Sequence, residues 1–144
     1  MTLYLDTSSL VKIYVPETGV DVVLGLMDHA TTVATSVVTY AETRAALARL
    51  RRERVLSAST FASAKRDLER DWPAYVTIDV TASVSRLAGD LAERYGLRGY
   101  DSLHLASFAE TAGRAGVEDA RFFSFDQRLT RAARAFARTI RRIR

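Results

Sequence analysis

The chain has 144 residues, of which 48% are hydrophobic and 26% are charged, and these are ordinary values for a globular protein. This length is sufficient for one domain with a substantial core. The absence of cysteine excludes disulfides, thiolate nucleophiles and cysteine-ligated zinc. No apolar run approaches the ~20 residues that span a bilayer, and the first residues lack the pattern of a signal peptide. We therefore expect a soluble cytoplasmic protein that does not associate with a membrane.

The net charge of +4 is unevenly distributed along the chain. Residues 127–144 contain seven arginines and no acid, which leaves a net charge of −3 on residues 1–126. Arginine outnumbers lysine by nineteen to two, and arginine is the better bidentate ligand for phosphate. The basic terminus is compatible with a surface for an acidic partner and equally with a solvated face.

The first predicted elements follow from apolar runs and the polar residues that interrupt them. An apolar run at residues 1–5 ends in Asp6, and three hydroxyl residues precede the next apolar stretch. This order predicts a short buried strand, a tight turn and a helix opened by a side-chain cap. We then expect a helix capped by Thr18, a strand at 31–35, a long helix from a cap at Ser36 to about Glu53, and a helix from Ser57 to Asp71.

The second half of the chain continues the alternation of strands and helices. A strand at 75–80 precedes a helix at 81–95 with Gly96 as its C-cap, and a loop at 97–100 leads into a helix from Asp101 to Ala112. A strand at 121–125 and a helix from about residue 127 follow. Residues 139–143 keep helical spacing but equally suit a short edge strand. This alternation predicts one α/β domain over residues 1–144 with a parallel sheet.

Four acids fall at predicted strand ends or on helix positions near them. Asp6 and Asp126 each follow a strand, and the carboxyl ends of parallel strands share one edge of a sheet. Glu42 lies on the apolar stripe of its helix, and Asp101 opens a helix. Converging carboxylates are costly unless a cation compensates their charge, and ligation by oxygen alone suits Mg²⁺ or Mn²⁺.

Each acid also has a simpler structural interpretation. Asp6 can cap its helix, Asp101 can compensate a helix dipole, and Asp126 can be a turn residue. Glu42 can pair with Arg49 or another base. His104 lies one turn after Asp101, where it is more typical of a histidine that satisfies a neighbour than of a general base.

Four segments in order resemble the PIN-domain ribonucleases, and in particular the VapC toxins of toxin–antitoxin pairs. The segments are LDTSSLVK (5–12), TYAE (39–42), RGYDSLHLA (98–106) and FSFDQRL (123–129). The similarity extends from the first strand to about Ala133. Two features depart from the family pattern: the glycine that usually precedes its last strand is missing, and the terminus is richer in arginine.

The resemblance implies a PIN-like three-layer α/β/α fold with a central parallel sheet of four or five strands. It implies that Asp6 and Asp101 bind the metal directly, and that Glu42 and Asp126 complete the pocket directly or through water. Ser124 stands where the family has a hydroxyl beside the site. The implied function is a Mg²⁺-dependent endoribonuclease, with Mn²⁺ as a substitute, that forms a homodimer and is inhibited by a VapB-like antitoxin.

Other interpretations remain open from the sequence. They are a PIN nuclease of housekeeping RNA processing, a catalytically inactive interaction module and a metal-binding signalling module of receiver type. The last is disfavoured because Asp6 lacks a paired acid and no lysine follows Lys65. For the RNA substrate, the candidate binding residues are Lys12, Arg44 and Arg49, with the terminal arginines as a further possibility.

Overall fold

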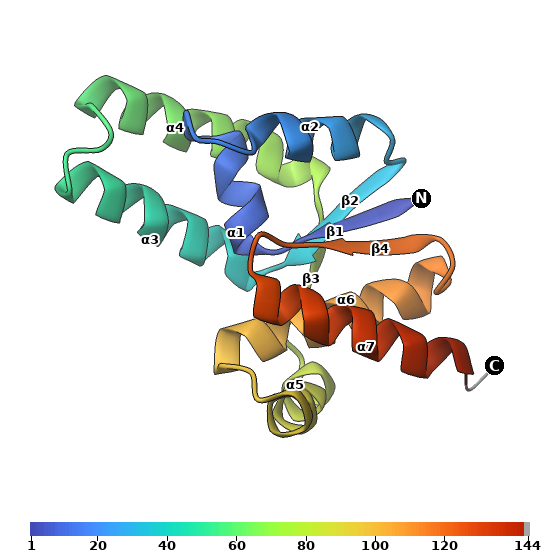
Figure 1. Cartoon of the computed structure of the whole chain (residues 1–144). Helices are drawn as coiled ribbons and strands as arrows, with labels where there is room; N and C mark the ends of the chain where they lie inside the picture. Colours follow the sequence, from blue (N-terminus) through green and yellow to red (C-terminus); the bar gives the residue numbers. More distant parts are fainter. Residues whose placement is uncertain (143–144) are drawn as a thin grey trace.

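The computed structural model describes residues 1–142, in which four parallel strands form one sheet. The strands are β1 (Thr2–Leu5), β2 (Thr32–Ser36), β3 (Val76–Ile78) and β4 (Ala120–Phe123). Their spatial order is β3-β2-β1-β4, and each neighbouring pair is parallel. The α/β fold is confirmed with a sheet of four strands, and all four carboxyl ends lie at the same edge (Figure 1).

Helices connect the strands and cover both faces of the sheet (Figure 1). The helices are α1 (Thr7–Leu10), α2 (Val20–Asp28), α3 (Val38–Arg52), α4 (Ala58–Asp71), α5 (Ala82–Tyr95), α6 (Gly99–Ala115) and α7 (Gln127–Arg142). Two 3-10 turns, Val11–Ile13 and Trp72–Ala74, extend α1 and α4. None of the described helices is both long and apolar enough to cross a membrane.

The core has two parts, one on each face of the sheet. Alternating side chains of β1 point to opposite faces, so Leu3 and Leu5 join one part while Tyr4 joins the other. Leu3 and Leu5 pack with residues of α1–α4, and Tyr4 packs with residues of α5–α7. The central strand is therefore fixed from both sides, and Asp6 follows directly from it.

Most predicted helix boundaries are confirmed, but two predicted caps are wrong. Thr18 does not cap α2, because Gly19 occupies the N-cap position with a φ of 99°. Ser36 ends β2, and α3 follows Val37 without a side-chain cap bond. The helix predicted from Ser57 to Asp71 is confirmed as α4, and Ser57 is its N-cap, because its hydroxyl accepts from the amide of Thr60.

Two further predictions need correction in the second half. Asp101 does not open its helix, because α6 begins at Gly99, and the helix continues through Gly113 to Ala115. Residues 139–142 belong to α7 rather than to a fifth strand. Ile140 packs on the core, and the Thr139 hydroxyl donates to the Ala135 carbonyl one turn earlier, which favours the helix. Residues 143 and 144 lie outside the described part.

Candidate active site

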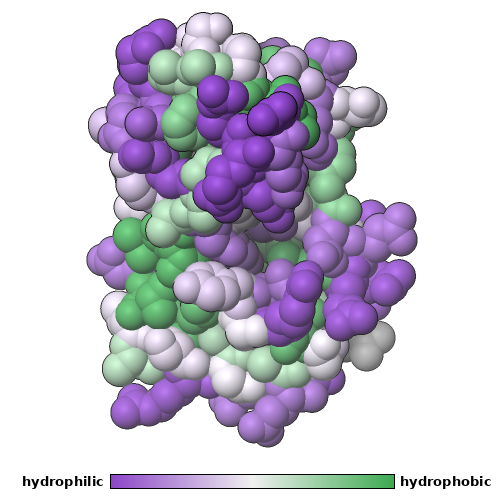
Figure 2. All heavy atoms as spheres, turned by 90° about the vertical axis from the view of Figure 1, so that its left-hand side faces the viewer, coloured by the Kyte–Doolittle hydropathy of each residue, from purple (hydrophilic) through white to green (hydrophobic). Residues whose placement is uncertain are grey.

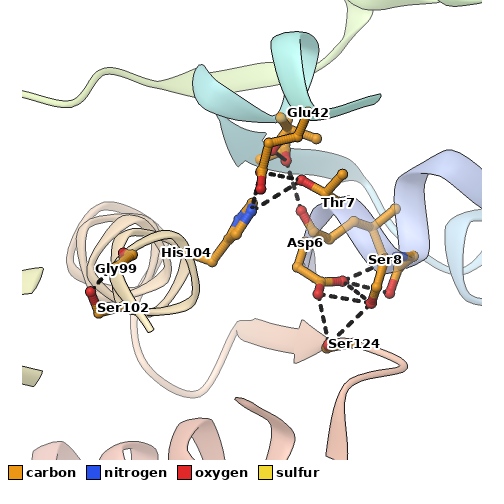
Figure 3. Close-up of polar contacts among 12 residues, drawn as sticks. Asp6, Thr7, Ser8, Glu42, Gly99, Ser102, His104 and Ser124 are labelled. Atoms are coloured by element: carbon orange, nitrogen blue, oxygen red, sulfur yellow. Dashed lines mark hydrogen bonds and ion pairs between the residues drawn. The ribbon is translucent and has the colours of Figure 1, made fainter. Parts of the chain in front are cut away.

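Asp6 lies at the carboxyl end of β1, where hydroxyl groups hold its carboxylate. Its Oδ1 accepts from the Ser9 amide at 3.1 Å and from the Ser9 hydroxyl at 2.8 Å, which makes Asp6 the N-cap of α1. Its Oδ2 accepts from the hydroxyls of Ser8 at 2.8 Å and Ser124 at 2.7 Å (Figure 3). The carboxylate is buried and fixed in one orientation, as a preorganised ligand must be.

Glu42 belongs to a network that crosses from α3 to α6. The Thr7 hydroxyl donates to its Oε2, and His104 Nε2 lies 2.9 Å from the same oxygen (Figure 3). An ionised carboxylate only accepts, so His104 carries a proton on Nε2. In the neutral imidazole, Nδ1 then accepts from the hydroxyl of Tyr4 at 3.0 Å. His104 thus forms hydrogen bonds with two neighbours, Tyr4 and Glu42, as expected for a histidine with a structural role rather than a general base.

The network determines the charge of Glu42. Burial alone would raise the pKa of Glu42, but the hydrogen bonds from His104 and Thr7 outweigh it, so the pKa lies below the ordinary 4.5. Burial also raises the pKa of Tyr4 well above its usual range, so its hydroxyl stays protonated. At neutral pH, Glu42 is an ionised carboxylate that two donors hold at the sheet edge.

Asp101 and Asp126 share one cation, the guanidinium of Arg98. Arg98 Nε lies 3.2 Å from Asp101 Oδ2, and its Nη2 lies 3.9 Å from Asp126 Oδ2. Asp126 also caps α7, because its Oδ1 accepts from the Leu129 amide at 2.9 Å. The Arg98 side chain is 78% exposed, so it leaves both carboxylates open to an incoming cation.

Short bridges link the four acids at one edge of the sheet. Ser124 donates to Asp6 and accepts from the amide of Asp126 at 2.9 Å, and Thr7, which follows Asp6 in the chain, donates to Glu42. Among the described residues, no group of three or more acids or histidines has the spacing of a metal site. Hydroxyl, imidazole and guanidinium donors instead contact these carboxylates.

The donor set nevertheless fits a hard divalent cation. All four acids supply oxygen, and Asp101 and Asp126 can already approach one positive charge together. Asp6 and Asp126 are connected by a single hydroxyl, that of Ser124. A cation at this edge would replace Arg98 as the counter-charge of the acids.

The sequence did not identify several residues of the site. Tyr4 and Arg98 were not predicted as site residues, and Tyr4 lies one hundred positions from its partner His104. The hydroxyls of Thr7 and Ser8 were visible only as a polar run after the first strand. The contacts of Tyr4 and Thr7 depend on packing between distant segments, for which no local pattern exists.

Known proteins are similar to this chain in sequence and in fold. The model of the PIN domain matches residues 3–135. The chain belongs to the PIN-domain family. Ribonuclease VapC45 and ribonuclease VapC49, from the CDC 1551 / Oshkosh and H37Rv strains of Mycobacterium tuberculosis, are each 41% identical to it over 105 residues. The match covers 73% of this chain and 73% of each relative. This PIN-domain protein thus belongs with the VapC-type ribonucleases.

Solved structures agree with the PIN-domain fold. Mycobacterium tuberculosis VapC20, described as a toxin that cleaves the sarcin–ricin loop, aligns with a TM-score of 0.66 and 18% identity, over 90% of this chain and 94% of its own. FitAcB from Neisseria gonorrhoeae aligns with a TM-score of 0.64 and 18% identity, over 92% and 93%. VapBC2 from Rickettsia felis, bound to a promoter DNA fragment, aligns with a TM-score of 0.55 and 18% identity, over 88% and 100%.

These findings confirm the predicted family and fold, and the receiver-type alternative is wrong. The PIN nuclease family is generally metal-dependent. Two of the three predicted RNA-binding residues form ion pairs within the chain. Lys12 pairs with Glu17 at 2.9 Å, and Arg44 pairs with Glu69 at 3.0 Å. Arg49 is exposed on α3. Their contact with RNA stays a prediction.

Proposed function

We propose that the chain is a Mg²⁺-dependent endoribonuclease whose catalytic residues are Asp6, Glu42, Asp101 and Asp126. The observation that supports this role most strongly is the linkage of these acids at the carboxyl edge of a parallel sheet, where α/β proteins bind ligands. Figure 2 looks onto this edge and shows a surface that is hollowed between its upper and lower parts.

The chain's own groups divide the work. Asp6 and Asp101 would hold the cation, Mg²⁺ or Mn²⁺, with Glu42 and Asp126 completing its surroundings directly or through water. The bound cation would neutralise the scissile phosphate and lower the pKa of the attacking water. Glu42, which is ionised and held by His104 and Thr7, or alternatively Asp126, would orient this water. Ser124 keeps the carboxylate of Asp6 in place.

The replacement of Asp101 by asparagine tests this assignment. We expect Asp101→Asn to reduce Mg²⁺-dependent cleavage of RNA at least about 100-fold, because it removes a charge that stabilises the transition state. Cleavage of a labelled RNA with Mg²⁺ or with EDTA measures the effect, and Asp90→Asn on the exposed face of α5 is the matched control. Full activity of Asp101→Asn would refute the assignment.

We further propose that the chain acts as a toxin in the cytoplasm, where it meets its RNA substrate and a VapB-like antitoxin. Expression of the wild-type chain without the antitoxin should arrest growth, whereas Asp101→Asn should not. A housekeeping nuclease would instead leave growth unaffected. The antitoxin should restore growth and copurify with the chain.

A homodimer is also part of the proposal. Val22 and Leu24 on α2 and Val55 after α3 are large apolar residues exposed to solvent. They lie in the amino-terminal half of the chain. Light scattering of the purified chain at several concentrations measures its association state, and a monomer at all concentrations would refute this part.

A further inference from the structure

A groove of about 470 Å³ runs beside the outer edge of β4, between this strand and α7. It exists because β4 is the last strand of the described sheet and α7 stays helical to Arg142, so no fifth strand covers this edge. Figure 1 shows α7 passing alongside β4 from the carboxyl edge toward the opposite end. The floor of the groove is apolar and includes Phe108 and Phe122.

The rim of the groove is basic. Arg121 of β4 and Arg134 and Arg138 of α7 line it, and all three are exposed. The ion pairs found among the described residues include none of these three, and no acid is among the described residues that line the groove. Three arginines without counter-charges beside an apolar floor favour a polyanion that also has apolar surface.

The groove adjoins the candidate active site at Ser124. Ser124 lines it and also donates to Asp6 Oδ2 at 2.7 Å. Thr130, also in the lining, donates to the Ser124 carbonyl at 3.1 Å. Residues 130, 134 and 138 are each four positions apart, so they form a row on one face of α7 with steps of about 6 Å. This row leads from the acids along the groove, with a spacing comparable to that of successive phosphates in an extended strand.

We propose that this groove binds single-stranded RNA beside the bond that is cleaved, with Arg134 and Arg138 contacting successive phosphates. The inference deepens the proposed ribonuclease function and rests on it. The arginines would position the backbone while the apolar floor contacts a base, which gives binding without strict sequence preference. An added peptide strand at the edge of β4 is the competing occupant. The row of Thr130, Arg134 and Arg138, which begins one helical turn after Asp126, favours RNA.

Charge reversal on the two faces of α7 tests the groove. The test pair is Arg134→Glu with Arg138→Glu, and the control pair is Arg128→Glu with Arg131→Glu. Arg128 and Arg131 are exposed on the same helix but line a different hollow, near Gly96. Both pairs of substitutions change the net charge by the same amount. A loss of long-range electrostatic attraction to RNA would therefore affect both pairs equally.

Binding is measured with a fluorescent oligoadenylate in EDTA, so that the result does not depend on cleavage or on the catalytic acids. We expect the test pair to weaken binding at least tenfold and to lower the slope of log K against log salt by about 1.4, the value for two phosphate contacts on a single strand. The control pair should leave this slope unchanged. Arg134→Gln with Arg138→Gln, checked by circular dichroism, repeats the test if the charge reversal impairs folding.

Three results would overturn the groove as an RNA site. The first is unchanged RNA binding by the folded test pair, and the second is an equal loss in both pairs. The third is a loss of binding to a polyglutamate peptide with RNA binding intact, which would indicate an acidic protein partner instead. Because these measurements omit metal, they separate failure of the groove from failure of the catalytic assignment, which the Asp101→Asn cleavage assay tests.

Discussion

At the residue scale, His104 couples the core of the protein to its candidate active site. Its ring is buried, and it joins the Tyr4 hydroxyl inside the core to the Glu42 carboxylate at the sheet edge. The position of His104 one turn after Asp101 was visible in the sequence. Its partners were not, because Tyr4 and Glu42 come from segments that only the folded sheet brings together.

The replacement of His104 by alanine should therefore destabilise the fold. We expect His104→Ala to lower the free energy of unfolding by about 1–3 kcal/mol, since the buried Tyr4 hydroxyl loses its partner. Urea unfolding at neutral pH measures this change. His29→Ala is the control, because His29 is exposed and its replacement should change the stability by less than about 0.5 kcal/mol. Equal stability of the two variants would contradict the role of His104.

Glu42 should make stability depend on acid pH. The pKa of Glu42 is lowered in the folded protein, so its ionisation stabilises the fold above the unfolded value near 4.5. This contribution disappears as the pH falls through the lower, folded pKa, because Glu42 is then protonated in both states. We expect the stability difference between the wild type and Glu42→Gln to be constant from pH 6 to about 5 and to diminish below about 4.5. Urea unfolding across this pH range measures it, and a difference that grows toward acid would have the wrong sign.

At the scale of elements, local sequence signals located helix ends that polar or glycine caps define. They missed the start of α2, which depends on a contact with a distant residue. Gly96 is the C-cap of α5 as predicted, with a φ of 63°, and the predicted helix starts at Ser57 and Thr81 prove to be the N-caps of α4 and α5. The start of α2 was wrong, because Gly19 rather than Thr18 adopts the cap position against Phe125. Phe125 is over one hundred positions away, so a local pattern could not reveal this contact.

Two glycines of the α2 region should respond oppositely to alanine. Gly19 has a φ of 99°, and a Cβ there would lie 2.7 Å from Phe125 Cζ, so Gly19→Ala should destabilise the protein by more than about 1 kcal/mol. Gly25 lies inside α2 with open space around it, so Gly25→Ala should stabilise the protein by about 0.5–1 kcal/mol. Thermal unfolding of both variants compares them. A stabilised Gly19→Ala would contradict the described start of α2.

At the scale of the whole molecule, the alternation of strands and helices predicted the parallel sheet, and the sheet edge then predicted where acids from distant segments lie. Asp6 and Asp126 follow neighbouring strands β1 and β4, which pair in register from Thr2 with Ala120 to Leu5 with Phe123. The sequence could not predict which donors would separate the carboxylates. Ser8, Ser9 and Arg98 contact Asp6 and Asp101 locally, whereas the contacts of Ser124 with Asp6 and of Thr7 with Glu42 form only when distant segments meet at the sheet edge.

A cation held by these acids would be coupled to folding. If the four acids bind Mg²⁺, the cation binds the folded chain only, and it should stabilise the protein by about 2.7 kcal/mol at one hundred times its Kd. We expect the thermal midpoint to rise with Mg²⁺, to fall again with excess EDTA, and to stay constant in Asp101→Asn. Asp90→Asn, which alters an exposed acid of α5, should respond as the wild type does. Because unfolding is measured without RNA, a midpoint that ignores Mg²⁺ in the wild type would contradict the cation site itself, whatever the nuclease assay shows.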